Sequence, residues 1–325
     1  MARPKKNGVT IADIAAKCGV SPATVSRVLY KRPHVDEEVR QRISAEIVRS
    51  NYQFQHTSRA GKVLVLTSDA ASLINGEYYY ELLNALHAVF RQEGYVTVVA
   101  QASAFPLVGK GGFDAVISLG GLDNVMDYWS NHLVIPLIYV NRLPERMEPN
   151  CFTVSADHRK SIHDAVDLLC KNGHLRIGFL NTGSGREVYW RFMEEEAGFR
   201  EAMKERGLPQ NGMVIYTHNN EPHQALSELL RQNITALICP NATEGGKVAR
   251  ILQDLRWRVP DDCSIIVGDS EFYNRVNPVP LTAIRMPYEK IAAQCLEIVQ
   301  GKNNFPPPIP YEIIQRNSVK NRTQQ

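Results

Sequence analysis

Two short helical patterns meet at a tight turn near the start of the chain, in the segment 9–29 with sequence VTIADIAAKCGVSPATVSRVL. Thr10 is suited to cap the first helix, because its hydroxyl can accept a hydrogen bond from a free backbone N–H. Gly19 is suited to end that helix, because glycine readily adopts the left-handed conformation found there. Ser21 and Pro22 fit the cap and the first position of a second helix. The segment therefore predicts a helix-turn-helix.

Apolar residues recur at helical spacing in both of these helices and in a third helical pattern that begins at about Asp36. They are Ile11, Ile14, Ala15 and Cys18, then Val25, Val28 and Leu29, then Val39, Ile43 and Ile47. Three small helices that share one apolar face predict a compact all-α head. In such a unit the second helix is the one shaped to enter the major groove of DNA.

The charge of the chain is distributed unevenly. Residues 1–62 contain twelve Lys and Arg against five Asp and Glu, whereas the remainder carries a small net negative charge. A basic head on a mildly acidic body is typical of a protein that binds a polyanion. On charge alone, a solvated run of basic residues is an equally good interpretation. The helical pattern within the same segment favours DNA.

The second helix of the head is expected to expose four residues to bases, Pro22, Ala23, Ser26 and Arg27. Arginine pairs well with guanine, and small apolar groups can contact the methyl group of thymine. The wider predicted DNA-binding set, in which the polar and basic residues position the head on phosphates, adds Arg3, Lys5, Lys6, Thr10, Ser21, Thr24, Lys31, Tyr52 and Arg59. A three-helix module that contacts another protein is the alternative.

The run VTIADIAAKCGVSPATVSRVLYKRPHVDEEVRQRI resembles the DNA-binding domain of the LacI/GalR family of transcriptional regulators almost position for position. The resemblance implies a homodimer that binds a pseudo-palindromic operator. It also implies a hinge after the third helix that reads roughly P-N-x-x-A-R-x-L and wedges its Leu into the minor groove.

The predicted hinge, residues 53–61, departs from that pattern. Ser58 and Arg59 fall where the family has Ala-Arg, but Gly61 occupies the position of the wedge. Glycine has no apolar side chain to insert between base steps, and it disfavours a helix. We therefore expect a weak or absent hinge helix, or a different wedge such as Phe54.

From residue 62 onward, short apolar runs alternate with helical patterns. The strand candidates are 63–69, 96–101, 115–121, 136–141, 177–182, 236–241 and 264–269, and the helix candidates are 77–94, 158–172, 188–206, 222–232, 244–256 and 287–300. Continuously apolar strands that alternate with helices predict α/β structure with two doubly wound parallel sheets. Ligands of such folds bind at the carboxyl ends of the strands.

The body also resembles the family, for example in ADHRKSIHDAVDLLCKNGHLRIGFLNT. This resemblance implies a periplasmic-binding-protein-like core of two subdomains that close on a small effector. The predicted domains are a head at 1–52, a shortened hinge at 53–61 and an effector-binding and dimerisation domain at 62–325. Within the last domain we expect one subdomain from 62–154 plus 286–308, and another from 155–285 plus 309–325.

Polar and aromatic residues at the predicted strand ends are candidates for effector binding. They are Asp69, Tyr78 and Tyr79 near the first strand, and Asn241 and Asp269 after two later strands. Aromatic faces and a carboxylate suit a sugar, whose hydroxyls demand hydrogen bonds. Each tyrosine taken singly is more often a core residue.

A further departure from the family concerns the helix that precedes Gly198. Family members usually place an Arg where this chain has Glu195, and that Arg grips the hydroxyls of the sugar. A carboxylate only accepts hydrogen bonds, so its specificity differs from that of a guanidinium. Arg191, one turn earlier, is the alternative cation. A sugar or sugar derivative is the first expectation, with a cationic ligand or no ligand as alternatives.

Other classes of protein are disfavoured. The six cysteines form no C-x-x-C pair, so neither a metal site nor a cofactor is expected. No catalytic motif is present, and the glycine clusters at 109–112 and 183–186 lack phosphate-loop spacing and are interpreted as turns. The N-terminus is not a signal peptide, which favours a cytoplasmic regulator over a periplasmic-type binding protein. A repressor is expected, although only the position of the operator separates repression from activation.

Overall fold

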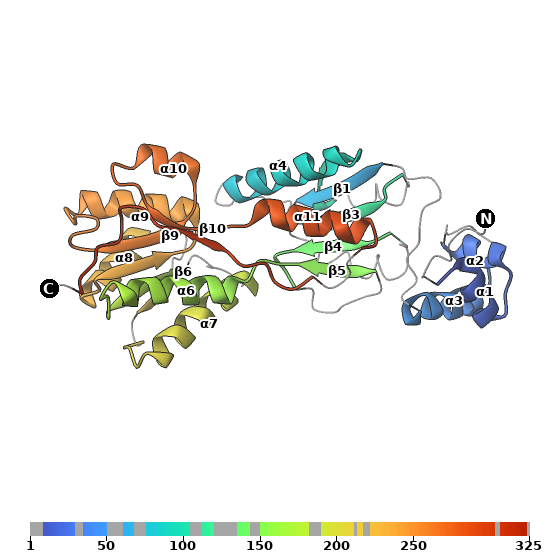
Figure 1. Ribbon diagram of the computed structural model, residues 1–325, viewed down its shortest axis with the longest axis horizontal. Helices are drawn as coiled ribbons and strands as arrows, with labels where there is room; N and C mark the ends of the chain where they lie inside the picture. Colours follow the sequence, from blue (N-terminus) through green and yellow to red (C-terminus); the bar gives the residue numbers. More distant parts are fainter. Residues whose placement is uncertain are drawn as a thin grey trace, which may run out of the picture.

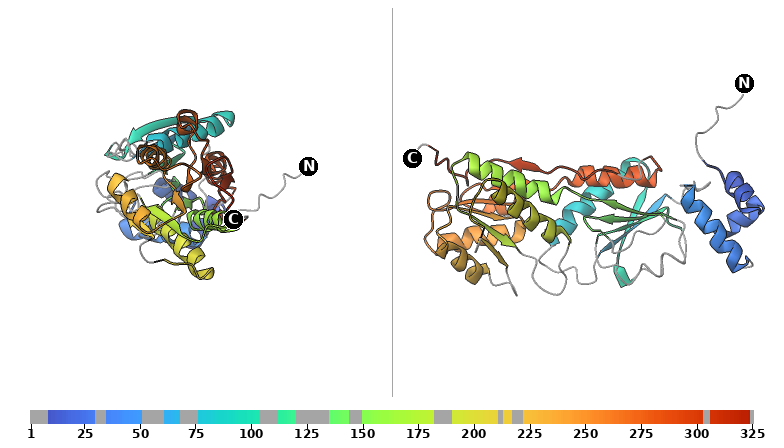
Figure 2. Two further views of the ribbon diagram at one scale, coloured as in Figure 1. Left: turned by 90° about the vertical axis from the view of Figure 1, so that its left-hand side faces the viewer. Right: turned by 90° about the horizontal axis from the view of Figure 1, so that it is seen from below.

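The computed structural model describes residues 9–29, 35–50, 61–67, 76–103, 112–119, 135–143, 150–181, 190–210, 213–216, 222–302 and 306–323. The molecule is elongated, with a helical head at one end and two α/β subdomains behind it (Figures 1 and 2). Several predicted features fall outside the described residues. They are Arg3, Lys5, Lys6, Lys31, Tyr52, Arg59 and Asp69, together with 53–60 of the hinge, most of the glycine cluster 109–112 and all of 183–186.

The head consists of α1 (Ile11–Cys18), α2 (Pro22–Leu29) and α3 (Glu37–Arg49) around one small core. The expected caps are present. The backbone N–H of Asp13 donates to the hydroxyl of Thr10 over 3.2 Å, and the N–H of Thr10 donates back to the Asp13 carboxylate over 2.8 Å. Gly19 follows α1 with a φ of 64°, in the left-handed region. The capping box begins α1, and the left-handed Gly19 ends it and lets the chain turn into α2, as expected for a helix-turn-helix.

The first subdomain contains a five-stranded parallel sheet of order β2-β1-β3-β4-β5. Its strands are β1 (Lys62–Thr67), β2 (Val96–Gln101), β3 (Ala115–Ser118), β4 (Leu137–Val140) and β5 (Cys151–Val154). The helices α4 (Gly76–Gln92) and α11 (Tyr288–Val299) pack side by side against one face of this sheet (Figure 1).

The second subdomain contains a six-stranded sheet of order β11-β10-β9-β8-β6-β7, parallel except for the antiparallel pair of β10 and β11. Its strands are β6 (Ile177–Asn181), β7 (Val214–Tyr216), β8 (Ala236–Cys239), β9 (Ser264–Gly268), β10 (Thr282–Arg285) and β11 (Glu312–Ile314). Its helices are α6 (His158–Lys171), α7 (Trp190–Glu205), α8 (Pro222–Arg231), α9 (Ala242–Asp254) and α10 (Glu271–Val276).

The chain passes between the two subdomains at β5–α6, at β10–α11 and at the segment before β11. Two of these passages are joined, because the backbone N–H of Asp157 donates to the carbonyl of Ile309 over 2.8 Å. A helical head followed by two largely parallel sheets confirms the predicted fold class. The exact domain boundaries stay a prediction.

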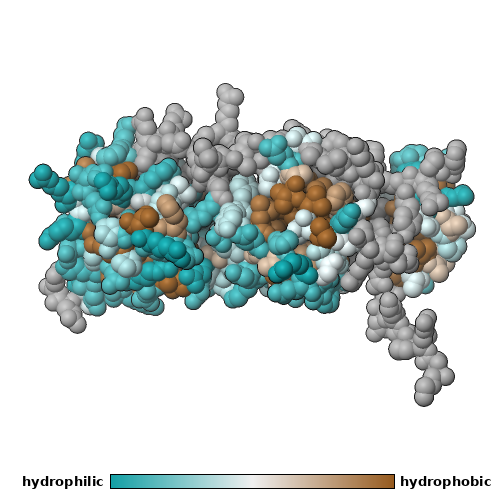
Figure 3. Space-filling model, turned by 90° about the horizontal axis from the view of Figure 1, so that it is seen from above, coloured by the Kyte–Doolittle hydropathy of each residue, from teal (hydrophilic) through white to brown (hydrophobic). Residues whose placement is uncertain are grey.

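One edge of the first sheet is unusually apolar on its outside. The edge strand β2 exposes Val96 and Val99, whose side chains are 57% and 52% accessible. Figure 3 shows apolar side chains gathered on the face of the molecule that carries α4. Exposed apolar side chains on an edge strand are typical of a surface that another chain covers.

Candidate functional site

The second helix of the head presents its polar side outward. Pro22, Ala23 and Arg27 are exposed and Ser26 is half-buried, whereas Val25, Val28 and Leu29 are buried in the core of the head. This exposed row matches the predicted base-reading set. The hydroxyls of Ser21 and Thr24 lie 2.9 Å apart, and Ser21 also accepts from the backbone N–H of Thr24, so both residues order the first turn of α2.

A partly exposed ionic contact links α1 to α3. Lys17 on α1 lies 2.9 Å from the carboxylate of Glu46 on α3, and the hydroxyl of Ser50 donates to the same carboxylate. These hydrogen bonds, with that from Ser50 the stronger, lower the pKa of Glu46 to about 2. The carboxylate therefore stays charged at neutral pH, and its contacts stabilise the packing of α1 and α3, the two helices that support α2.

Five of the seven predicted effector residues line one cavity between the subdomains, namely Tyr78, Arg191, Glu195, Asn241 and Asp269. Of the other two, Asp69 lies outside the described residues. Tyr79 does not line the cavity; it is half-buried against the core of the first subdomain and meets Tyr78 edge to face at 5.4 Å. For Tyr79 the core interpretation of a tyrosine is therefore the better one.

Arg191 and Glu195 form an ion pair within the cavity wall. The Nε of Arg191 donates to Oε1 of Glu195 over 2.8 Å, and the two side chains are 17% and 4% exposed. Burial raises the pKa of Glu195, an effect that the charge of Arg191 partly offsets. Of the described residues, none donates a hydrogen bond to Oε2 of Glu195. One carboxylate oxygen is therefore engaged with Arg191, and the other keeps its capacity to accept hydrogen bonds.

Three tyrosines line the same cavity as this pair, and only Tyr78 among them was predicted from the sequence. Tyr78 accepts from the amide nitrogen of Asn141 over 3.1 Å, and burial raises the pKa of its hydroxyl to about 12. Tyr288 begins α11 and Tyr311 precedes β11, so these residues come from segments far apart in the chain. The inner cavity that remains between all these side chains has a volume of only about 50 Å³.

Tyr311 also connects the cavity to the crossing between the subdomains. Its hydroxyl lies 2.7 Å from Nδ1 of His158, the first residue of α6. Burial, together with the nearby charge of Arg191, lowers the pKa of His158 well below its ordinary value. His158 is therefore neutral at physiological pH.

Asn241 and Asp269, the predicted effector residues that follow β8 and β9, each make hydrogen bonds that stabilise the fold. Asn241 caps α9 by accepting from the backbone N–H of Glu244 over 3.0 Å. Asp269 accepts from Arg285 and from Arg316, each over 2.7 Å, one to each carboxylate oxygen. Burial opposes ionisation of Asp269, but these hydrogen bonds lower its pKa below the ordinary value. Asp269 therefore lines the cavity as an ionised carboxylate that two arginines hold in place.

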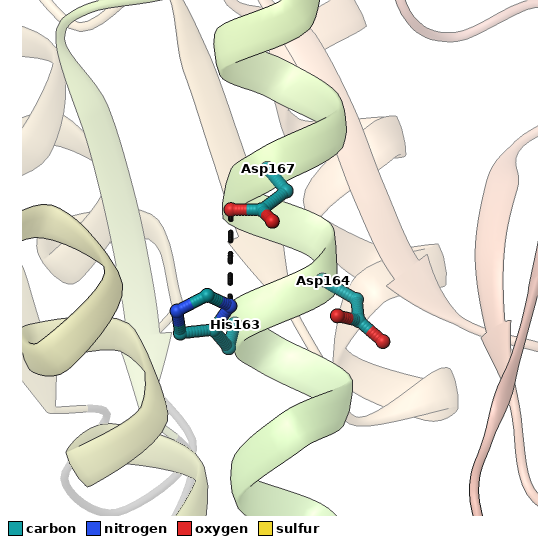
Figure 4. A group of neighbouring side chains, drawn as sticks. All are labelled: His163, Asp164 and Asp167. Carbon is teal, nitrogen blue, oxygen red and sulfur yellow. Dashed lines mark ion pairs between the residues drawn. The ribbon is translucent and has the colours of Figure 1, made fainter. Parts of the chain in front are cut away.

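One cluster has the composition of a metal site. The ligand atoms of His163, Asp164 and Asp167 on α6 lie within 4.8 Å of one another. Asp167 pairs with Arg206, and His163 Nε2 lies 2.9 Å from Glu205. Asp164 pairs instead with Lys160 and points away from the His163–Asp167 pair (Figure 4). Each of these side chains already has a polar or charged partner, so we interpret the cluster as part of a side-chain network that links α6 to α7.

Both the helical head and the α/β body of this chain are similar to known proteins. A family model described as "Bacterial regulatory proteins, lacI family" matches residues 10–54, and a model for a periplasmic binding protein-like domain matches residues 166–319. The HTH-type transcriptional regulator GalR of Escherichia coli is 26% identical over 313 residues, with 89% of this chain and 88% of GalR covered. The chain belongs to the LacI/GalR family.

Other LacI/GalR family members extend the agreement along the chain. The HTH-type transcriptional repressor PurR of Mannheimia succiniciproducens is 24% identical over 307 residues, with 89% of this chain and 90% of PurR covered. A transcriptional regulator CelR–cellobiose complex has a TM-score of 0.67 at 21% identity, with 95% and 99% covered. The lac repressor dimer bound to operator and the anti-inducer ONPF has a TM-score of 0.64 at 18% identity, with 97% and 100% covered. The structural likeness shows a shared fold.

These relatives confirm the prediction of a DNA-binding transcriptional regulator of the LacI/GalR family rather than an enzyme. Within the part of the chain that the structure describes, no helix is both long and apolar enough to cross a membrane.

Proposed function

We propose that this LacI/GalR family member is a homodimeric, cytoplasmic repressor that binds a pseudo-palindromic operator and responds to a small effector, a sugar or sugar derivative. In this proposal residues 1–52 bind DNA, residues 53–61 form the hinge and residues 62–325 bind the effector and the second copy. The observation that carries the proposal is the exposed face of α2, which includes Arg27, on a head that precedes a cleft between two subdomains.

The head supports sequence-specific binding to DNA. Arg27 is exposed on the helix that enters the major groove in this class of domain, where a guanidinium can contact guanine. Pro22 and Ala23 add a small apolar surface for thymine. The other predicted DNA contacts are proposed to position the head on the phosphates.

The apolar edge of the first subdomain supports a dimer. A second copy related by a two-fold axis would cover Val96 and Val99 and place two heads on one side of the DNA. The structural relative with bound operator is itself a dimer. Two heads related by a two-fold axis require an operator with the same symmetry.

The cleft supports an effector that bears hydroxyl groups. Tyr78, Tyr288 and Tyr311 offer aromatic faces and hydroxyls, and Arg191 and Glu195 offer a charged donor and acceptor. A relative of the same fold was solved with cellobiose. In the present conformation the inner cavity is far smaller than the roughly 300–1,000 Å³ of ordinary ligand sites, so the subdomains would have to open to admit a sugar.

The proposal is tested by incubating the purified protein with sheared genomic DNA of its source at near-physiological salt and sequencing what is retained. We expect strong enrichment of a short inverted repeat near promoters. Diffuse recovery that is lost as the salt concentration rises would show nonspecific binding and contradict the proposal.

A further inference from the structure

A second, larger cavity lies at the mouth of the cleft. It has a volume of about 560 Å³ and is bounded by α4 of the first subdomain and α10 of the second. It shares the lining residues Glu77 and Thr243 with the inner cavity, so the two cavities are adjacent. A ligand in this outer cavity would contact both subdomains at once.

The walls of the outer cavity are aromatic. Tyr80 on α4 and Phe272 on α10 are each 63% exposed, and Phe272 meets Tyr273 edge to face at 5.2 Å. Large aromatic side chains that line a cavity from both subdomains offer π-faces to a ligand. Such faces attract cations, most of all ammonium groups.

The outer cavity is also rich in carboxylates. Glu77, Glu81 and Glu271 line it, and among the described lining residues Arg275 is the counter-charge. Arg275 pairs with Glu271 and leaves the two carboxylates of α4 uncompensated. Burial raises the pKa of Glu81, and the negative charges of Glu77, Glu271 and Glu289 raise it further. A bound cation would relieve this repulsion between like charges.

The inner cavity gives a second, independent indication of the same kind of ligand. The side chain of Glu195 lines this cavity and is only 4% exposed. Its Oε2 accepts no hydrogen bond from a described residue. A buried acceptor of this kind favours a ligand that donates hydrogen bonds. The inner cavity of about 50 Å³ is too small for a whole sugar, whereas the outer cavity has room for one.

We propose that the outer cavity, walled by Tyr80, Glu81 and Phe272, binds the ammonium group of a small organic effector whose hydroxyl-bearing part extends toward Glu195. This inference rests on the proposed effector-responsive regulator and narrows the effector to an amine-bearing polyol, such as an amino sugar. The ammonium group, held between aromatic faces and carboxylates of both subdomains, then favours the closed arrangement of the cleft.

The test uses three matched probes with the full-length protein in isothermal titration calorimetry. Glucosamine carries the ammonium group, N-acetylglucosamine replaces it with a neutral amide, and choline offers a quaternary ammonium alone. We expect glucosamine and choline to bind and N-acetylglucosamine to bind at least about tenfold more weakly. Equal binding of the two sugars, or no binding of either cation at millimolar concentration, would overturn the proposal.

Two variants locate the site. Phe272→Ala and Glu81→Gln should each weaken glucosamine binding by about tenfold, since each removes one contact with the ammonium group. Val276→Ala on the same helix and Glu228→Gln on α8 are matched controls outside the cavity and should leave binding unchanged. Unchanged binding in Phe272→Ala and Glu81→Gln would overturn the assignment. So would dissociation of the dimer by Phe272→Ala, because the cavity would then be a subunit interface.

Operator binding by the ligand-free protein is measured separately. If it persists while the cationic probes fail, only the effector assignment is wrong. If it is absent, the proposed regulator itself is contradicted.

Discussion

Arg191 donates from Nε to Oε1 of Glu195 over 2.8 Å, one turn apart on α7, and both side chains line the cleft. Glu195 occupies the position where family members usually carry an arginine, so its carboxylate looked in the sequence like the loss of the effector-binding cation. In the structure, the guanidinium of Arg191, one turn earlier, lines the cavity together with the carboxylate of Glu195. The cavity therefore retains a cation, which comes from one turn earlier on α7.

Replacing one member of this buried ion pair should lower the stability of the folded protein. Arg191→Leu leaves the carboxylate of Glu195 buried without its partner, and we expect the free energy of unfolding in urea at pH 7 to fall by about 3–5 kcal/mol. Burial already raises the pKa of Glu195, so the loss should shrink as the pH falls and the carboxyl becomes neutral. The double variant Arg191→Leu/Glu195→Leu should recover most of the stability. A single variant as stable as the wild type would contradict the pairing.

Gly61 lies immediately before β1 and is hydrogen-bonded to the segments that flank it in the first subdomain. Its N–H donates to the Asp114 carboxylate over 2.8 Å, its carbonyl accepts from Val96, and its φ is 65°. A Cβ there would lie 3.6 Å from Gly94 O, an ordinary contact, so the cost of a side chain lies in the left-handed backbone. We expect Gly61→Leu to lower the free energy of unfolding by about 1–2 kcal/mol without strengthening operator binding.

Gly61→Asn is the matched control for that prediction, because asparagine tolerates the left-handed region and should lose less stability. Tighter operator binding by Gly61→Leu would show instead that residue 61 acts as a minor-groove wedge.

Much of the fold was predictable because its signals are local. The caps at Thr10 and Gly19 mark the ends of α1, and the fully buried strands β3, β8 and β9 and the buried middle of β1 are mainly apolar runs. The strands β5, β7, β10 and β11 were missed, as was α10. Each of these strands has only three or four residues, and β7 and β11 are only partly buried, so they carry no clear periodicity.

The site was less predictable because its partners meet only in the folded chain. Tyr288 and Tyr311 reach the cavity from two separate crossings between the subdomains, and nothing in their neighbouring residues distinguishes them from core tyrosines. Asp269 was predicted as an effector contact from its place at a strand end. Its two arginine partners follow from the packing of β9, β10 and the C-terminal segment, which the sequence does not reveal locally.

His174 makes stability depend on pH. Its ring is buried between the hydroxyl of Thr235 and the carbonyl of Lys320, each at 3.0 Å, and burial lowers its pKa to about 4. The unfolded chain therefore takes up a proton near pH 6.5 that the folded chain refuses, so stability is lost as the pH falls from about 6.5 to 4. This single group should account for about 3 kcal/mol.

The measurement compares urea unfolding of the wild type and of His174→Gln across that pH range. The difference between the two curves isolates His174 from His158, which is also buried and remains in both proteins. The exposed His87→Gln serves as the control. Parallel curves for wild type and His174→Gln would refute the role of His174.

Val99→Glu tests the proposed dimer face. The side chain is 52% exposed, so a glutamate there should be tolerated by the folded monomer. A two-fold axis through the edge strand brings the two copies of the new charge close together without partners, and we expect dissociation in sedimentation experiments. Met193→Glu, on α7 and 58% exposed, is the matched control. A Val99→Glu protein that sediments as an unaltered dimer would place the interface elsewhere.

Arg27→Ala tests whether α2 reads bases. If Arg27 contacts a guanine, the variant should lose about 1–3 kcal/mol of affinity for the operator and accept other bases at one position of each half-site. Binding to random DNA should change much less, because phosphate contacts made by other residues remain. Arg40→Ala on α3 removes the same charge from the head without altering α2 and is the control. The affinities of the variant for operator and for random DNA are measured at the same salt concentration. An equal loss of affinity for both would make Arg27 a phosphate contact. Sequence specificity would then have to come from Ala23 and Ser26.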